Sequence, residues 1–521
     1  MVRPGRSVAC GGVVPTSARG VAGGLYEKHH RAGNAARKAD RVGETSGQNS
    51  SVAHAAPGGA GHPGSPDAGG FTGGVPWRVL LLAAAYFFFI LTSYYMLRPI
   101  RETMAIERGA DKLPWLMTAT LVVMLLVNPA YAFLVSKFPR RRFVPITHYF
   151  FGLNIVAFFA ATRLLPAETL HSLGYAFYIW LSVFNLFVVS IFWSIMADVF
   201  GRDRAKKVFG VIAVGGTLGA ICGPIIVNSL LGGGLSLEWP FGEKPAAWTP
   251  VEFPKVEREW VFLAALVPLQ AAILCAGSLI KRGEAWRSGA AARAEEREPT
   301  ADALAGFRRI VGSRYLQTLS LYMLLFTITS TFIYVEQANM IAEKVPDAAA
   351  RTKAFANLDL YTNLLTLGTQ LFLTRQIIRL LGVGGTLAVL PAITFCGFGA
   401  LAVTGSVPVL YSYQVVRRGM HYAVDRPARE VLYTPLSPDE KYKSKAFIDT
   451  FVYRAGDMLG GWAPTWLGKV SGWIGLKAAL PSWTLWMPLS LLWIATAVVL
   501  GVMQRHAGNA GGKLPGQESK A

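Results

Sequence analysis

Long apolar runs separated by short polar segments make up most of the chain after Trp77. A helix needs about 20 apolar residues to cross the hydrocarbon core of a bilayer, and about twelve runs reach or approach that length. The predicted spans lie at approximately residues 77–97, 115–136, 143–163, 174–199, 208–230, 260–280, 316–334, 358–373, 382–403, 407–424, 446–467 and 483–504. The pattern therefore predicts an all-α polytopic membrane protein with about 12 transmembrane helices.

Composition agrees with this class, and the charge distribution orients the chain. Of the 521 residues, 52% are hydrophobic and 16% are charged, which is more apolar than an ordinary soluble domain. The formal net charge of +20 does not indicate a nucleic-acid partner, because the basic clusters occupy alternate loops. These clusters lie at residues 137–142, 201–207, 281–282, 307–314 and 440–445. By the positive-inside rule we expect these loops and both termini to be cytoplasmic.

Three segments are too polar or too rich in small residues to form spans. Residues 1–75 are rich in Gly, Ala, Pro and Ser and are expected to be a disordered tail. No signal peptide is evident there, and the alternative is an organellar transit peptide, because the tail is rich in Arg and poor in acidic residues. Residues 282–314 form a cytoplasmic linker and 506–521 a disordered C-terminal tail. The linker predicts two six-helix halves, 76–281 and 315–505.

Short matches between the halves support a repeat. "MAIERGAD" after the first span resembles "MIAEKVPD" after the seventh, and "GGTLG" at Gly215 resembles "GDMLG" at Gly456. "VVSIFWSIMAD", ending at Asp198, aligns without gaps to "VVRRGMHYAVD", ending at Asp425. We therefore expect the two aspartates at equivalent cytoplasmic helix ends, in halves related by an axis along the membrane normal. That is the major facilitator arrangement, with a central cavity.

Several motifs resemble the ATP/ADP translocase family of plastids and intracellular bacteria. "HYAVDRPAREVLYTPLSPDEKYKSKAFID", at 421–449, is similar to a family stretch with Tyr-Ile-Pro-Leu-Asp, a Lys-rich turn and Lys-Ala-Ala-Ile-Asp. "MLRPIRETMAI" resembles its Leu-Arg-Asp-Thr-Lys-Asp-Thr-Leu, "FWSIMAD" its Phe-Trp-x-x-x-Asn-Glu, and "YVEQ" its seventh-span Val-Glu. The resemblance implies a nucleotide transporter and spreads over most of the chain after Trp77.

The resemblance also implies site residues. The family's first-span lysine falls on Arg101, its fourth-span glutamate on Asp198 and its seventh-span glutamate on Glu336, so the sign of each charge is kept. Where the family has Lys in Gly-Lys-Ser-Gly-Gly, this chain has Asp457, which reverses the charge. We therefore expect ATP to bind more weakly than a smaller or less charged anion.

Charges within the first span allow two interpretations. Arg98 and Arg101 lie on one side of the helix together with Glu102. Either the arginines sit at the outer interface and snorkel, or Pro99 bends the helix so that they line the cavity.

The tenth span has Arg417 and Arg418 near its middle, and Arg417, His421 and Asp425 recur every four residues. A charge at the bilayer centre costs about 3 kcal/mol or more, so such groups face a wet cavity or a partner. Either they pair with acidic residues, or they bind an anion, because guanidinium groups suit phosphate and carboxylate.

Two further spans carry polar side chains at membrane depth. The eighth has Asp359, Asn363, Thr366 and Gln370 along one face, which is either a cavity lining or an interhelical contact. The eleventh mixes charges at Asp449, Arg454 and Asp457. Asp359, Asn363, His421 and Arg454 therefore join the candidate substrate-binding residues.

Motifs of soluble enzymes are not evident. "GVIAVGGT", at 210–217, has the glycine spacing of a P-loop, but Gly216 replaces its lysine and no strand precedes it, so close helix packing is the better interpretation. We find no zinc-ligand cluster, catalytic triad, dinucleotide fingerprint or ATPase motif, and we expect neither an enzyme nor a cofactor or metal. Energy for transport is then expected from an exchanged substrate or an ion gradient.

The leading hypothesis is a secondary active transporter of an organic anion, with nucleotide exchange by alternating access. The alternatives are a proton-coupled carrier of a non-nucleotide metabolite and a non-transporting membrane sensor or assembly partner. We expect a small anionic substrate, a lipid bilayer and no nucleic acid as partners, and a monomer. A bacterial inner membrane is the expected location, with a plastid envelope as the alternative.

Overall fold

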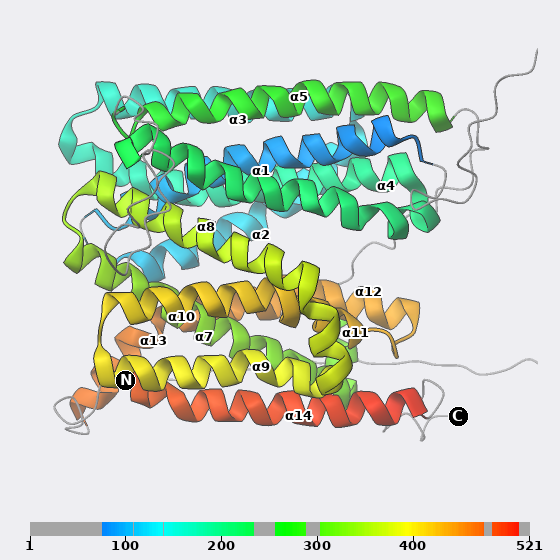
Figure 1. Cartoon of the computed structure of the whole chain (residues 1–521), viewed down its shortest axis with the longest axis vertical. Helices are drawn as coiled ribbons and strands as arrows, with labels where there is room; N and C mark the ends of the chain where they lie inside the picture. The colour runs from blue at the N-terminus through cyan, green and yellow to red at the C-terminus, as the bar shows by residue number, and fades with distance from the viewer. Residues whose placement is uncertain are drawn as a thin grey trace, which may run out of the picture. The chain divides into compact units, whose positions relative to one another are not determined.

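The computed structural model describes residues 75–107, 109–138, 140–233, 256–287, 303–473 and 482–509. These residues form helices and no strands (Figure 1). The predicted tails lie outside the described residues, apart from Val75, just before the first helix, and residues 506–509 at the end of the last helix. Within the predicted linker, residues 282–287 continue a helix and 303–312 form another.

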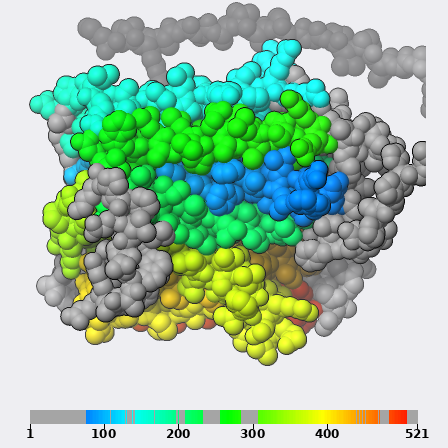
Figure 2. Space-filling view, turned by 45° about the horizontal axis from the view of Figure 1, so that its top comes forward, coloured from blue at the N-terminus to red at the C-terminus, as the bar shows by residue number. Residues whose placement is uncertain are grey.

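The described part of the first half contains five helices and one π-helical turn. Their bounds are α1 (Trp77–Ala105), α2 (Leu113–Lys137), α3 (Arg140–Leu164), α4 (Ala167–Asn228), η1 (Ser229–Gly233) and α5 (Trp260–Arg287). A short helix, α6 (Ala303–Gly312), precedes the second half. α5 lies beside both α1 and α3, and Figure 2 shows it in green across one face of the molecule.

The helices of the second half are interrupted more often than those of the first half. Its elements are α7 (Arg314–Lys344), α8 (Ala348–Phe372), α9 (Thr374–Thr404), α10 (Val407–Met420), η2 (His421–Asp425), α11 (Arg426–Val431), α12 (Pro438–Phe447), η3 (Ile448–Val452), α13 (Tyr453–Trp473), η5 (Ser482–Trp486) and α14 (Met487–Asn509). The π-helical turns η2 and η3 fall within the two predicted spans that carry the most charge. Local π-helical geometry is frequent at functional sites.

Helix α4 contains two membrane spans of opposite direction. The rings of Trp193 and Phe209 have centroids 5.1 Å apart, although sixteen residues of straight helix would separate them by about 24 Å. The chain therefore turns back between the apolar stretches Glu168–Met196 and Val208–Gly232. Both stretches pack on α1, since Gly174 meets Met104 and Gly219 meets Phe88.

Eight helical stretches among the described residues are long and apolar enough to cross a membrane. They are Trp77–Ala105, Arg141–Leu164, Glu168–Met196, Val208–Gly232, Trp260–Arg282, Arg314–Lys344, Thr374–Thr404 and Trp483–His506. The other predicted spans are helical as α2, α8, α10 and α13. The prediction of an all-α polytopic membrane protein is confirmed.

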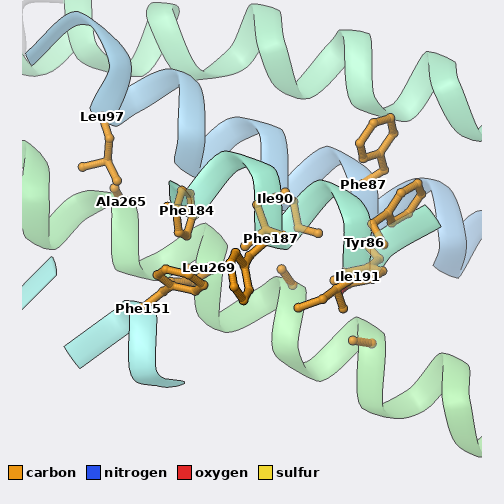
Figure 3. Packing of buried hydrophobic residues seen from close by; sticks show 14 of the residues in the cluster. Tyr86, Phe87, Ile90, Leu97, Phe151, Phe184, Phe187, Ile191, Ala265 and Leu269 are labelled. Atoms are coloured by element: carbon orange, nitrogen blue, oxygen red, sulfur yellow. The ribbon is translucent and has the colours of Figure 1, made fainter. Parts of the chain in front are cut away.

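Aromatic side chains fill the core of the first half. Phe87 of α1 stacks on Phe192 at 4.2 Å between centroids, and Phe151 of α3 lies edge-on to Phe184 and Phe187 of α4. Figure 3 shows Phe87, Phe151, Phe184 and Phe187 with Leu269 of α5 in one cluster. The glycine-rich stretch that resembles a P-loop lies on the helical surface facing α1, in agreement with the packing interpretation.

Several pairs of helices join the two halves, among them α2 with α13, α4 with α8, and α1 with α8. In one pair, Trp462 of α13 donates a hydrogen bond to Thr118 of α2 over 3.2 Å. In another, Asn228 at the end of α4 donates to Asn357 of α8 over 2.5 Å. A buried apolar cluster closes the end of the bundle where α1 ends. This end cluster consists of Ala105, Ile106, Ala110, Leu113, Leu116 and Tyr178 from the first half and Val335, Ala338, Ile341 and Phe355 from the second.

Candidate substrate cavity between the two halves

A cavity of about 740 Å³ lies between the halves. Its lining includes eight basic and five acidic side chains, a formal excess of three positive charges. The basic ones are Arg98, Arg101, Arg417, Arg418, Arg426, Arg429, Lys445 and Arg454, and the acidic ones are Glu102, Asp359, Glu430, Asp449 and Asp457. Arg426 and Glu430 are exposed, so the cavity reaches solvent at the end opposite to the end cluster. Its size suits a small-molecule ligand.

The charges of the first span line this cavity. Helix α1 continues through Pro99 to Ala105, and the Arg101 side chain is buried. Arg101 hydrogen-bonds to Glu102 and lies over the ring of Tyr178 at 4.6 Å. Tyr334 of α7 donates to the other oxygen of Glu102. The snorkelling interpretation is therefore wrong for Arg101, whose charge is held between the two halves.

One carboxylate joins three helices. Asp359 of α8 accepts hydrogen bonds at Oδ1 from Arg98 of α1 at 2.6 Å and from Arg418 of α10 at 2.7 Å. The Asp359 residue is only 3% exposed. Two guanidinium groups share one carboxylate, so these three side chains together keep an excess of positive charge beside the cavity. An anion entering the cavity can take the place of Asp359 at either arginine.

Arg417 has different hydrogen-bond partners from the adjacent Arg418. Its Nε donates to Thr394 of α9 at 3.3 Å and its Nη1 to Ser330 of α7 at 3.2 Å. Its Nη2 has no hydrogen-bond partner, although the residue is only 2% exposed. No ion pair involves Arg417 within the part of the chain that the structure describes. A buried guanidinium that lines a cavity and hydrogen-bonds only to hydroxyl groups has donors left that suit an anion.

His421 and Asp425 belong to a buried network behind Arg417. Asp425 accepts hydrogen bonds from Tyr322 at 2.5 Å and from His421 at 3.1 Å, and pairs with Arg429 at 3.1 Å. The His421 ring stacks on Phe326 at 4.3 Å and lines the cavity, whereas Asp425 does not. Asp425 thus fixes the cavity wall, and among the described residues it forms no ion pair with Arg417.

The eleventh-span residues line the cavity on another side. Asp457 of α13 accepts from Thr331 of α7 at 3.0 Å and pairs with Arg454 at 3.2 Å. The pair is formally neutral. Asp449 also lines the cavity, one element earlier on η3.

Comparison with known proteins adds to this geometry. No family model matches the chain. It is similar to ADP,ATP carrier protein 1 of Chlamydia trachomatis, at 22% identity over 464 residues, covering 78% of this chain and 85% of the carrier. The same carrier of Chlamydia muridarum is 22% identical over 465 residues, with the same coverage.

Solved transporters have the same fold. An auto-inhibited POT family peptide transporter matches with a TM-score of 0.54 at 14% identity, covering 85% of this chain and 99% of its own. A bacterial ferroportin homologue in the inward-facing state matches with 0.52 at 14% identity, covering 83% and 99%. The protein is ADP,ATP carrier-like in sequence and has the major facilitator fold. A mutant of the nucleoside transporter NupG also matches, with 0.50 at 13% identity, covering 82% and 99%.

In this carrier-like chain, three predicted site residues lie outside the described cavity lining. Glu336 was expected to face the cavity but does not line it. Tyr334 and Gln337 of the same helix do, and Glu336 follows Tyr334 by about 200° around α7. Asn363 donates to the carbonyl of Ala220 in α4 at 3.2 Å, so it is an interhelical contact. Asp198 lies in α4, and its side chain is outside the described residues.

Uncharged cavity residues of the carrier-like chain were not predicted. Ser330, Tyr334 and Gln337 of α7 all line the cavity, and Gln337 accepts a hydrogen bond from Gln414 of α10 at 2.6 Å. Their spacing of four and three residues puts them on one helical face, and this signal was available in the sequence. Hydroxyl and amide groups are common in apolar helices, so they mark a cavity lining less clearly than charged groups do.

Proposed function

We propose that this protein is a secondary active transporter that exchanges organic anions, with nucleotides as the leading substrate class. The observation that carries the proposal is the buried Arg417 guanidinium, without a carboxylate partner, in a cavity with an excess of positive charge. Alternating access then consists of closing this cavity at one end and opening it at the other. The relatives named ADP,ATP carriers are the reason to test nucleotides first.

Arg417, Arg418 and Arg98 are proposed to bind the anionic part of the substrate. Arg101, His421, Arg454 and Asp457 surround the remaining space, and Asp359 competes with the substrate for its two arginines. The halves are proposed to be 76–281 and 315–505, joined by the linker at 282–314. Arg98 belongs to the first half and Arg418 to the second. An anion bound to both arginines would therefore contact both halves of the protein.

The orientation is also a proposal. The positive-inside rule assigns the loops at 201–207 and 440–445 and both termini to the cytoplasm. The end cluster then faces outward, and the cavity opens to the cytoplasm near Lys445. A bacterial inner membrane fits this arrangement.

The decisive experiment is uptake into proteoliposomes. Purified protein is reconstituted, vesicles are loaded with unlabelled ATP, ADP, AMP or simple phosphorylated and carboxylated metabolites, and uptake of the labelled compound is measured. We expect counterflow with at least one nucleotide. Uptake driven only by an imposed proton gradient would favour the proton-coupled carrier. Absence of transport across the whole panel, with folded protein in the vesicles, would favour the non-transporting alternative.

A further inference from the structure

Helix α9 begins with a segment that its membrane span does not need. The backbone of Gly382 has φ 64° and ψ −178°, which interrupts the helix. Residues 383–404 measure about 33 Å at 1.5 Å per residue, enough to cross the hydrocarbon core alone. A Cβ atom at Gly382 would meet nothing within 4 Å, so the glycine is there for its left-handed conformation and not for packing. Residues 374–381 before it are therefore a separate short helix, the leading segment of α9.

The leading segment and the end of α8 expose large apolar side chains. Leu380 is 78% exposed and Phe372 is 71% exposed. Leu371, Leu373 and Leu381 are exposed as well. Surfaces that face water rarely expose so many large apolar side chains together, whereas surfaces that contact a membrane do. These residues connect the end of one membrane span to the start of the next, so they lie at the membrane boundary, where acyl chains are available to them.

Two arginines accompany these apolar side chains. Arg375 and Arg379 are exposed and four residues apart, so they share one helical face, and Leu380 lies about 100° further around the helix. No Asp or Glu occurs in the sequence between Asp359 and Asp425. Among the described residues, neither arginine has a hydrogen bond or an ion pair. A short amphipathic helix with apolar side chains beside unpaired arginines has the chemistry that binds the surface of an anionic membrane.

Hydrogen bonds hold the leading segment against η2. Thr374 donates to the backbone carbonyl of Ala423 at 2.8 Å, and Gln370 donates to that of Tyr422 at 3.3 Å. The exposed face is thus fixed relative to the bundle before lipid binds, so binding costs little conformational entropy. None of residues 370–381 lines the cavity.

We infer that residues 371–381 bind anionic phospholipid at the membrane surface, with the apolar side chains among the acyl chains and the two arginines on the phosphate groups. Arg375 and Arg379 suit this role because a guanidinium group donates to phosphate oxygens in pairs. A second copy of this chain is a poorer partner, since it would bring the same two positive charges against them. A free phosphate ion would leave the apolar side chains in water. The surface lies outside the cavity, so its lipid contact goes beyond the proposed transport and does not depend on it.

Native mass spectrometry of detergent-purified protein, titrated with phosphatidylglycerol or with phosphatidylcholine, tests the headgroup. We expect phosphatidylglycerol to bind at least about tenfold more tightly than phosphatidylcholine. Arg375→Gln combined with Arg379→Gln should remove this preference, and the corresponding pair of Lys substitutions, which keeps both charges, should retain most of it. Arg308→Gln combined with Arg314→Gln is the matched control, because it removes two exposed arginines from α6 and the start of α7 instead.

Three outcomes of this titration would contradict the inference. The first is a preference for phosphatidylglycerol that persists in the pair of Gln substitutions at Arg375 and Arg379. The second is an equal loss in the control pair, since lipid binding would then follow overall charge. The third concerns glycerol 3-phosphate, which carries a phosphate but no acyl chains and should not displace the lipid. Full displacement would assign the site to a free anion.

A second measurement locates the leading segment in a bilayer without changing its arginines. A nitroxide is attached at Leu380→Cys, in a background without the native cysteines, and the protein is placed in vesicles of phosphatidylglycerol and phosphatidylcholine. We expect the nitroxide to collide more often with molecular oxygen, which concentrates in lipid, than with a water-soluble nickel complex. Thr434→Cys, at an exposed site in the turn after α11, is the aqueous control and should show the reverse. Access of the nickel complex to the label at Leu380 would place the segment in water, and protection from both reagents would indicate a protein partner. Either result would overturn the lipid contact.

Discussion

Asp359 of α8 accepts a hydrogen bond from Arg98 of α1 over 2.6 Å, and this contact joins the two halves of the protein at the cavity. The same carboxylate oxygen binds Arg418 of α10. An internal carboxylate thus occupies the position at two arginines that an external anion would otherwise take. If substrate binds these arginines as proposed, its binding and the contact between the halves are linked by this competition.

Asp359→Asn should strengthen anion binding and weaken the contact between the halves. The amide keeps the shape but loses the charge, so Arg418 loses its carboxylate partner and Arg98 keeps only Glu102, at 3.8 Å. Both arginines then become more available to an anion. We expect the Kd for a bound nucleotide to fall by about tenfold, which corresponds to ~1.4 kcal/mol. Calorimetric titration of detergent-purified protein measures this. Unaltered affinity in a folded variant would show that Asp359 does not compete.

Tyr334→Phe should loosen the closed end of the bundle. The substitution removes the hydroxyl that donates to Glu102, a hydrogen bond to a charged group that stabilises by about 1.5–3 kcal/mol. Thr103 and Thr352 lie nearby on opposite halves, with hydroxyl oxygens 3.0 Å apart, so a cysteine pair there reports closure by disulfide yield. We expect a lower yield in Tyr334→Phe.

Tyr178→Phe is the matched control for this experiment. It removes a bond between two neutral hydroxyls at 3.2 Å and leaves the bond from Tyr334 to Glu102 in place. The disulfide yield should then stay close to that of the parent. Equal yields in both variants and the parent would mean that the Glu102 contact does not hold the halves together.

Asp457→Lys should shift preference toward more highly charged anions. The side chain lies in the cavity wall and pairs with Arg454, so the change adds two positive charges near the substrate. We expect ATP to compete better for labelled uptake, relative to AMP and simple carboxylates, in Asp457→Lys than in the parent. Asp457→Asn should lie between the parent and Asp457→Lys. Tight ATP and ADP exchange in the parent, unchanged in Asp457→Lys, would show that this charge does not determine specificity.

Gly219→Val should destabilise the first half. A Cβ atom at Gly219 would lie 2.2 Å from the backbone oxygen of Phe88, so α1 and α4 would have to separate. Overpacking of this kind costs about 1–3 kcal/mol. Gly210→Val on the same helix is the control, because a Cβ there meets nothing within 4 Å. Thermal unfolding in detergent should show a lower Tm only for Gly219→Val, and equal Tm values would contradict the close-packing interpretation.

The pattern of apolar residues was sufficient to predict the membrane-spanning helices. The reversal inside α4 coincides with the basic segment at 201–207 between two predicted spans, because a charged stretch does not stay in the hydrocarbon region. The helix α6 was not predicted, since its ten residues are too short and too polar to be a span. Its place within the predicted linker shows that a hydrophilic connection can still be helical.

The amino-acid sequence by itself determined which segments cross the membrane and which charges lie at membrane depth, since both follow from local hydropathy. Tertiary structure alone decided what each charge contacts. Arg417 and Arg418 are adjacent in the sequence, yet they point about 100° apart on their helix. One therefore meets Asp359 of α8, and the other donates to hydroxyl groups of α7 and α9 and lies over the ring of Phe326. The rotation of each helix against its neighbours sets this difference, and no local pattern encodes it.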